Sequence, residues 1–131
     1  MIDHISLHVS DYAKSRSFYL AALAPLGYSM IMEFPAPAPD GRSGTVGGLG
    51  AGGKPDVWIT DLGQDGAHAI HLALAASDRA KVDAFYAAAI AAGAKSNGEP
   101  GLRPQYHPNY YGAFVIDLNG HNLEAVCHTP G

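Results

Sequence analysis

Alternating polar and apolar residues mark the start of the chain as a half-buried strand. Between residues 4 and 9, histidine and serine occupy one set of alternate positions, and isoleucine, leucine and valine occupy the other. A period of two is the pattern of a strand that buries one face. His4 and His8 therefore lie on the same face of this predicted strand. Residues 68–75 repeat the pattern and predict a second strand.

Two alanine-rich runs, 12–24 and 79–92, carry apolar residues at helical spacing and predict two helices. A serine-aspartate pair precedes each run and supplies short side chains that can cap a helix. A glycine follows each run, where a left-handed residue commonly ends a helix. The capping pairs are Ser10-Asp11 and Ser77-Asp78, the terminating glycines are Gly27 and Gly93, and the predicted inner faces carry Phe18, Ala22, Phe85 and Ala89.

Further strand-like runs follow each predicted helix, separated by turns rich in proline and glycine such as 35–41. The predicted strands are 28–34, 45–46 and 57–60 after the first helix, and 110–117 and 122–127 after the second. The glycine-rich stretch 44–53 lacks the Lys-Ser/Thr ending of a phosphate-binding loop, so we expect hairpin turns or a mobile flap there.

The chain is an imperfect internal repeat. Residues 4–24 align with residues 71–91 at a constant offset, and eleven of the 21 aligned positions are identical. The repeat predicts two copies of one module, at about 1–66 and 67–131, within a single domain. Each module reads as a strand, a helix and about three more strands, which is an α+β arrangement. We expect a ligand cleft on the concave face between the modules.

Composition narrows the functional classes. The 131 residues carry a formal charge of −4, and no basic run occurs along the chain, so nucleic acid and anionic membranes are poor candidate partners. Cys127 is the single cysteine, which excludes an intramolecular disulfide and suits a reducing compartment. No stretch is apolar and long enough to predict a membrane span. We expect a cytoplasmic protein that acts on a small-molecule substrate.

Seven histidines in so lightly charged a chain are the main chemical signal. The repeat places His4 and His71 at matched positions, and Glu124 lies within an otherwise apolar predicted strand. Two imidazoles and one carboxylate form a typical site for a divalent transition ion and leave positions open for water and substrate. A strand histidine is, however, more often a surface residue than a ligand. Glu124 could also pair with a distant cation such as Arg103.

Three groups of residues, spread over nearly the whole chain, carry a family resemblance: His4-x-x-x-x-Val9-x-Asp11 followed by Phe18-Tyr19, then His71, and finally Phe114-x-x-Asp117-x-x-Gly120-x-x-x-Glu124. Together they resemble the vicinal oxygen chelate superfamily, which groups glyoxalase I, bleomycin-resistance proteins and extradiol dioxygenases. The resemblance implies two βαβββ modules that form an incomplete, strongly curved mixed β-barrel with the helices outside. It also implies that His4, His71 and Glu124 hold a divalent ion (Zn, Ni, Mn or Fe(II)), which chelates adjacent substrate oxygens and stabilises an enolate-like intermediate.

The resemblance leaves the exact activity open. Glyoxalase I-like members take a fourth ligand, a glutamate, from the first module, and moving Glu124 back by one module reaches either Asp56 or Trp58. Asp56 is then a fourth ligand or a turn residue. The chain is expected to be a glyoxalase-like lyase or an extradiol dioxygenase-like oxidoreductase, and members of the superfamily are often homodimers. The alternative is a metal-free binding protein of the bleomycin-resistance kind.

A polar, aromatic segment at 103–111 precedes a core strand and is a candidate pocket rim. His107 or Tyr110 would act there as an acid, a base or a hydrogen-bond donor. An equally good interpretation is a structured loop whose tyrosines pack on the sheet. The other candidate pocket residues are His8, Trp58, Arg103 and Tyr111, whereas His68, His121 and His128 lie near turns or the end of the chain and are expected to be exposed.

Overall fold

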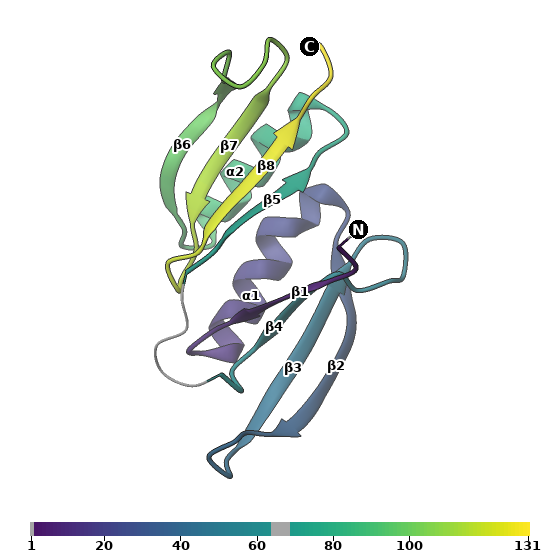
Figure 1. Ribbon diagram of the computed structural model, residues 1–131, viewed down its shortest axis with the longest axis vertical. Coiled ribbons are helices and arrows are strands. Elements are labelled where there is room, and N and C mark those ends of the chain that lie inside the picture. Colours follow the sequence, from purple (N-terminus) through teal and green to yellow (C-terminus); the bar gives the residue numbers. More distant parts are fainter. Residues whose placement is uncertain (1, 64–68) are drawn as a thin grey trace.

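The structure is a computed structural model that describes residues 2–63 and 69–131. Each half of the chain forms a four-stranded sheet and one α-helix (Figure 1). The first half contains β1 (Ile5–His8), α1 (Tyr12–Leu23), a short 3-10 helix η1 (Ala24–Leu26), β2 (Ser29–Pro37), β3 (Ser43–Gly50) and β4 (Val57–Thr60). The second half contains β5 (His71–Ala75), α2 (Arg79–Ala91), β6 (Lys95–Leu102), β7 (Tyr111–Ile116) and β8 (Asn122–Cys127).

The two sheets have the same topology. Their strand orders are β1-β4-β3-β2 and β5-β8-β7-β6, with β1 parallel to β4, β5 parallel to β8 and the other neighbours antiparallel. The predicted pair of βαβββ modules in an α+β fold is therefore confirmed, and the sheets do not close into a barrel. The predicted module boundary at 66/67 and the predicted exposure of His68 lie outside the described residues.

The ends of both helices follow from the residues that were predicted to form them. The Asp11 carboxylate accepts a hydrogen bond from the Lys14 backbone N–H at 3.0 Å, and Asp78 accepts one from Lys81 at 2.9 Å. Gly27, with φ of 86°, follows the short 3-10 helix. The predicted inner-face residues, Phe18 and Ala22 of α1 and Phe85 and Ala89 of α2, are buried. No helix in the described part of the chain combines the length and apolar content that crossing a membrane requires.

Each helix covers only one face of its sheet. In the first sheet, the alternate residues Leu7, Leu49 and Ile59 are buried on the face that α1 covers. The residues between them, including Trp58, belong to the opposite face. Figure 1 shows β1 crossing in front of α1, and β7 and β8 in front of α2. Both sheets thus keep a second, open face, and the two open faces lie side by side on the same side of the chain.

The prediction of turns or a flap at 44–53 is wrong for most of that stretch, because β3 continues to Gly50. Four residues of β3 are glycines, of which three lie close to neighbouring side chains and Gly50 lies close to the Lys54 backbone. A Cβ on Gly48 would lie 2.8 Å from the Trp58 ring, and one on Gly47 would overlap the Tyr12 hydroxyl. The role of these glycines is to let neighbouring groups approach the strand closely, and not to make the strand flexible.

Two strand segments contain prolines, which obscured them in the sequence. The predicted turn at 35–41 is partly wrong, because β2 continues through Pro35 and Pro37. The strand β6, which contains Pro100, was not predicted at all. Both strands lie at sheet edges, where a missing backbone N–H does not interrupt the ladder.

A buried polar contact joins the two modules. The Tyr19 hydroxyl on α1 donates to Asp117 Oδ2 at 2.5 Å, and Asp117 Oδ1 accepts the backbone N–H groups of Asn119 and His121 at 2.8 Å each. The predicted exposure of His121 is wrong, because this side chain is buried. Its ring bonds the Ile70 N–H through Nδ1 at 3.1 Å and the carbonyl of His8 through Nε2 at 3.1 Å.

Replacing Tyr19 with phenylalanine is expected to lower the free energy of unfolding by about 1–3 kcal/mol, because the buried Asp117 carboxylate loses a partner. Urea unfolding measures the loss. Tyr86→Phe is the matched control, since its hydroxyl bonds Ser96 at an exposed site. An equal loss in both variants would contradict a special role for the buried contact.

The same pair of variants tests a pH dependence. Burial, followed by the charge and hydrogen bond of Asp117, raises the pKa of Tyr19 well above its usual value. Unfolded tyrosine titrates near pH 10, so the folded protein holds this proton more tightly. The stabilising contribution is complete below about pH 10 and is lost as the pH rises further. Tyr19→Phe should therefore lose stability less steeply than the parent chain above pH 10.

Candidate metal centre

Glu124 is a buried carboxylate on the open face of the second sheet. Its partners in the strand ladder are Ala73 on β5 and Phe114 on β7, and its side chain is only 1% exposed. On β5, His71 lies two residues before Ala73, which pairs with Glu124. His71 and Glu124 therefore lie on the same face of the second sheet. His71 Nε2 lies 2.8 Å from Glu124 Oε2, and the histidine side chain is 53% exposed. The fold thus joins two of the three predicted ligands.

Tyr110 completes the immediate surroundings of this carboxylate by donating its hydroxyl proton to Glu124 Oε1. Burial and this hydrogen bond raise the pKa of Tyr110 to about 12, so the phenol stays protonated at neutral pH. Glu124 makes no ion pair with a lysine or arginine among the described residues, and the predicted alternative pairing with Arg103 is not observed. A buried carboxylate whose second oxygen faces a solvent-accessible imidazole has the donor chemistry of a metal ligand.

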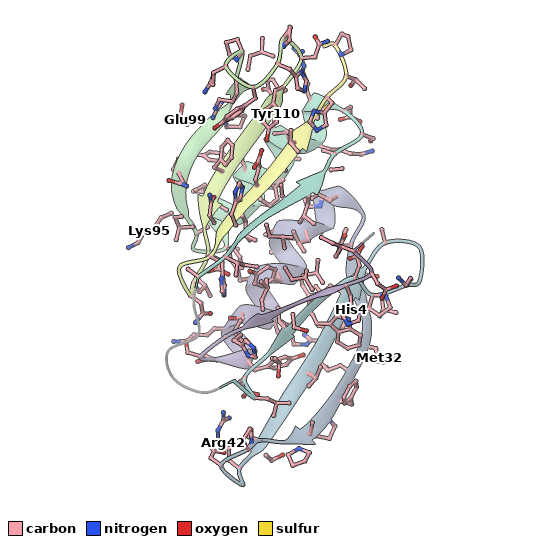
Figure 2. All side chains as sticks on the ribbon, in the orientation of Figure 1. His4, Met32, Arg42, Lys95, Glu99 and Tyr110 are labelled. Carbon is pink, nitrogen blue, oxygen red and sulfur yellow. The ribbon has the colours of Figure 1, made fainter. Side chains whose placement is uncertain are left out.

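His4 immediately precedes β1 of the other sheet. Its Nδ1 is 2.7 Å from Asp3 Oδ1, and its ring meets Trp58 edge-on with 6.5 Å between ring centroids. Figure 2 shows His4 in the first module and Tyr110, the partner of Glu124, at the far end of the second. Across residues 2–63 and 69–131, no three His, Cys, Asp or Glu side chains gather closely enough to hold an ion. A single chain therefore supplies His71 and Glu124 together and His4 separately.

The strand register decides which residue of the first module corresponds to Glu124. Ala73, two residues after His71, pairs with Glu124, whereas Ser6, two residues after His4, pairs with Trp58. The equivalent position is thus occupied by an indole and not by a carboxylate.

Asp56 precedes β4 and is engaged elsewhere. Burial and the neighbouring Asp56 carboxylate raise the pKa of Tyr28, and Asp56 Oδ1 is buried without a hydrogen-bond partner among the described residues. The carboxylate of Asp56 therefore faces the hydroxyl of a residue close to β2, and the open-face position on β4 belongs to Trp58.

The remaining candidate residues divide between the two faces of the sheets. Arg103 lies on the open face, with its guanidinium 5.3 Å from the centroid of the Phe114 ring. Tyr111 lies on the helix-covered face instead, where its hydroxyl donates to Asp83 at 2.7 Å. Tyr111 is consequently separated by the sheet from Glu124.

His107 takes part in contacts outside the His71–Glu124 pair. His107 Nδ1 accepts the Asn109 backbone N–H at 3.0 Å, so Nε2 carries the proton and donates to His128 at 2.7 Å. The His107 ring also packs against Tyr110 at 5.4 Å. His8 belongs to the open face of the first sheet, and the predicted exposure of His128 is confirmed.

Phe114 was missed as a site residue, although it stands in the motif that carries the family resemblance. Its ring lies 6.2 Å from the His71 ring and forms the floor between that histidine and Arg103. Alternation along β7 could have identified it, since Phe114 shares a face with Gly112, directly beside Glu124.

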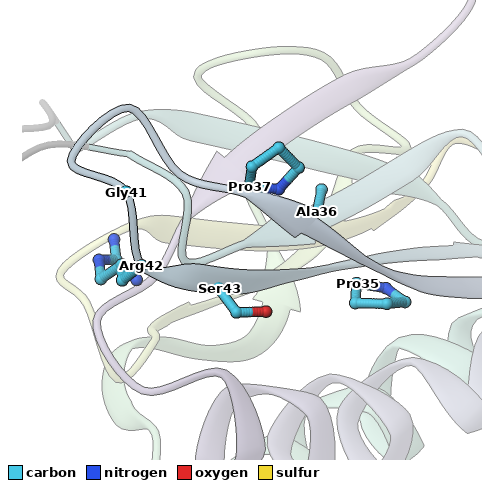
Figure 3. A pocket seen from close by; sticks show the side chains of 6 residues that line it. All are labelled: Pro35, Ala36, Pro37, Gly41, Arg42 and Ser43. Carbon is cyan, nitrogen blue, oxygen red and sulfur yellow. The ribbon is translucent and has the colours of Figure 1, made fainter.

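A surface hollow of about 310 Å³ lies elsewhere, at the hairpin between β2 and β3 (Figure 3). Its lining residues are Pro35, Ala36, Pro37, Gly41, Arg42 and Ser43. None of them is a histidine, cysteine or carboxylate. Figure 2 shows Arg42 and Tyr110 toward opposite ends of the folded molecule, so the hollow is separate from the candidate centre.

Three solved structures resemble this one over nearly the whole chain. A glyoxalase/bleomycin resistance protein from Albidiferax ferrireducens T118 is 26% identical, with 95% of this chain and 96% of that chain covered and a TM-score of 0.68. TioX from Micromonospora sp. ML1 is 19% identical, covers 95% and 96%, and has a TM-score of 0.68. Glyoxalase I from Zea mays is 23% identical, with 96% of this chain but 45% of that longer chain covered and a TM-score of 0.68. The latter two show a shared fold.

No curated protein sequence matches the chain as a relative. The family model described as the Glyoxalase/Bleomycin resistance protein/Dioxygenase superfamily, however, matches residues 1–125. The match spans both modules and includes the three predicted ligands. The chain therefore belongs to the glyoxalase/bleomycin resistance protein/dioxygenase superfamily.

Proposed function

We propose that this chain is a metal-dependent enzyme of the glyoxalase/dioxygenase type that acts on a small substrate with two adjacent oxygens. The observation that carries the proposal is the contact of His71 Nε2 with the buried Glu124 Oε2 on an open sheet face. These two side chains, with His4, supply the nitrogen and oxygen donors that suit Zn, Ni, Mn or Fe(II). When bound, such an ion acts as a Lewis acid on the oxygens of a chelating substrate.

We further propose that His4 comes from a second copy of the chain. His4 lies on the open face of one sheet, and the pair His71–Glu124 lies on the open face of the other. A twofold homodimer in which the first sheet of each copy faces the second sheet of its partner would form two equal sites. The same contact would cover the exposed apolar side chains Met32 and Phe34 on β2.

The surrounding side chains would orient the ligands and shape the cleft. Tyr110 donates to Glu124 Oε1, which turns Oε2 toward His71. Trp58 presents an apolar surface at the position that matches Glu124, so three protein ligands remain and the site stays open to substrate. His107 donates its hydrogen bond to His128, and its ring packs against the Tyr110 ring. We therefore propose that His107 helps to position Tyr110 and does not contact the ion itself.

One observation favours a second candidate, a metal-free binding protein. Trp58, Phe34 and Met32 form an aromatic and apolar surface on the open face of the first sheet, with Phe34 and Trp58 ring centroids 6.3 Å apart. Such a surface would suit sequestration of a planar apolar ligand. In that case the His71–Glu124 contact would serve as a hydrogen bond only.

Metal analysis separates the two candidates. Protein purified without added metal and dialysed against Ni²⁺, Zn²⁺, Mn²⁺ or Fe²⁺ is expected to retain about one ion per chain, measured by mass spectrometry of the metals. His71→Ala is expected to lose this uptake without unfolding, since the side chain is half exposed. His128→Ala, at an exposed position, serves as the control and should retain it. A parent chain that binds none of the four ions would exclude the metal-dependent enzyme, and full uptake by His71→Ala would exclude the proposed ligand set.

The preferred ion then separates the reaction types. An Fe(II) requirement with oxygen consumption would indicate an extradiol dioxygenase-like oxidoreductase. Dependence on Ni or Zn with a thiol adduct as substrate would indicate a glyoxalase-like lyase. An electrode measurement of oxygen uptake with Fe(II)-loaded protein distinguishes them first.

A further inference from the structure

We propose that Arg103 forms an anion subsite beside the metal centre, so that the substrate carries a carboxylate in addition to its two chelating oxygens. This inference deepens the proposed function and rests on it for the role of the neighbouring centre. The subsite itself is built from residues of β6, β7 and the turn between them.

The guanidinium of Arg103 is held by the backbone. Nη1 donates to the carbonyl of Gly101 at 2.8 Å, and Nη2 donates to the carbonyl of Glu99 at 2.7 Å. Its face lies over the Phe114 ring, 5.3 Å from the ring centroid. A guanidinium has five N–H donors, so three remain for a ligand after these two bonds.

Glycines of β6 leave the space that this arrangement needs. A Cβ on Gly98 would lie 3.1 Å from Arg103 Nη2 and 3.1 Å from Phe114, and a Cβ on Gly101 would lie 3.2 Å from Nη1. Gly98 also has a φ of 149°, which side chains rarely adopt. The register of β6 against β7 shifts between Ser96 and Gly98 and again between Gly98 and Gly101. The strand therefore departs from ideal geometry at the point where it receives the guanidinium.

The proposed Arg103 subsite lies next to the candidate metal centre, because the Phe114 ring is close to both Arg103 and His71. Phe114 lies beneath Arg103, is 6.2 Å from the His71 ring, and pairs with Glu124 in the ladder of β7 and β8. A small molecule chelated at His71 and Glu124 would extend along Phe114 toward the guanidinium. Because Arg103 and His71 both contact the Phe114 ring, the arrangement suits a compact substrate with its anionic group on the far side from its chelating oxygens.

The chemistry of the position favours an oxyanion and, among oxyanions, a carboxylate. No carboxylate pairs with Arg103 in the described part of the chain, and Glu99 beside it contributes only its carbonyl. A fixed, planar guanidinium matches a carboxylate through two parallel hydrogen bonds. A purely structural arginine would instead serve only to tie β6 to its own turn, and its replacement would then not distinguish a carboxylate ligand from a neutral one.

A series of catechols provides the probes, because each offers the same two adjacent oxygens. The carboxylate probes are 3,4-dihydroxybenzoate, 3,4-dihydroxyphenylacetate and 3,4-dihydroxyphenylpropionate, and 4-methylcatechol is the neutral reference. Titration calorimetry on the full-length, Zn²⁺-loaded protein measures each Kd. We expect the best-fitting carboxylate to bind at least about tenfold more tightly than 4-methylcatechol, as a charge-assisted hydrogen bond allows.

Arg103→Gln is expected to abolish this difference and to leave both 4-methylcatechol affinity and zinc stoichiometry unchanged. Arg42→Gln, at the exposed hairpin far from the centre, is the matched control. Arg103→Lys keeps the charge but not the planar fork, and it replaces the glutamine variant should the latter fail to fold. The subsite is refuted if no carboxylate binds more tightly than 4-methylcatechol, or if the Arg103 variant weakens both probe classes equally.

Failure of the proposed function is distinguishable from failure of the subsite. If the parent chain binds no zinc, the metal-dependent enzyme is excluded, and the subsite is then tested on the metal-free protein with 3-phenylpropionate against its neutral amide. A preference for the carboxylate that disappears in Arg103→Gln would support the subsite alone. Equal binding of acid and amide by the parent chain would overturn it.

Discussion

Replacing Glu124 with glutamine is expected to weaken binding of Ni²⁺ or Zn²⁺ by at least about a hundredfold, because the proposed site loses its only anionic ligand. The substitution keeps the shape of a side chain that is 1% exposed. The amide oxygen can still accept a hydrogen bond from the Tyr110 hydroxyl, and the amide NH2 can donate one to His71 Nε2, so the fold should remain intact. Calorimetric titration with each ion measures the loss.

The control for this substitution is Glu99→Gln, which removes an exposed carboxylate from the same sheet. It should leave metal affinity within about twofold of the parent chain, since an exposed charge contributes little over a distance. If Glu124→Gln binds the ion as tightly as Glu99→Gln, the buried carboxylate is not a ligand.

Replacing Trp58 with glutamate is expected to raise metal affinity by about tenfold to a hundredfold. The reason is the strand register: Trp58 pairs with Ser6, two residues after His4, just as Glu124 pairs with Ala73, two residues after His71. A glutamate there would add a fourth protein ligand and an additional negative charge to the proposed site. The comparison uses the same titration with Ni²⁺ and Zn²⁺.

Trp58→Leu is the control that distinguishes a gain in affinity caused by a new carboxylate ligand from one caused only by loss of the indole. This control keeps an apolar side chain beside Phe34 and should leave metal affinity near the parent value. An equal gain in both variants would indicate relief of crowding, and no gain in a folded Trp58→Glu dimer would refute the symmetric placement of the two modules around one ion.

The duplicated part of the fold was predictable because its signals are local. The helix caps at Asp11 and Asp78 and the alternation that begins at His4 depend on residues only a few positions apart. The glycines of β3 and the prolines of the edge strands were misread, because their roles depend on distant neighbours. Gly48 makes room for Trp58, and Pro100 is tolerated only because β6 has no partner on one side.

The candidate site was predictable in part. The repeat identified His71, and the apolar neighbours of Glu124 identified an unusual carboxylate, which the structure brings together. The choice between Asp56 and Trp58 required the strand register, because the segments between the strands differ in length between modules. His121 was predicted to be exposed because it follows a turn, but its three polar partners come from segments distant in sequence or from the turn itself.

Mixing two defective copies tests the proposed cross-chain site most directly. His4→Ala and Glu124→Ala homodimers should each bind no metal, because every site lacks one ligand. In a heterodimer purified through two different tags, His71 and Glu124 of the first copy would meet the intact His4 of the second. A centre shared between chains should hold about one ion per heterodimer, at parental affinity. A heterodimer that takes up no ion while the parent homodimer takes up two would contradict a centre shared between chains.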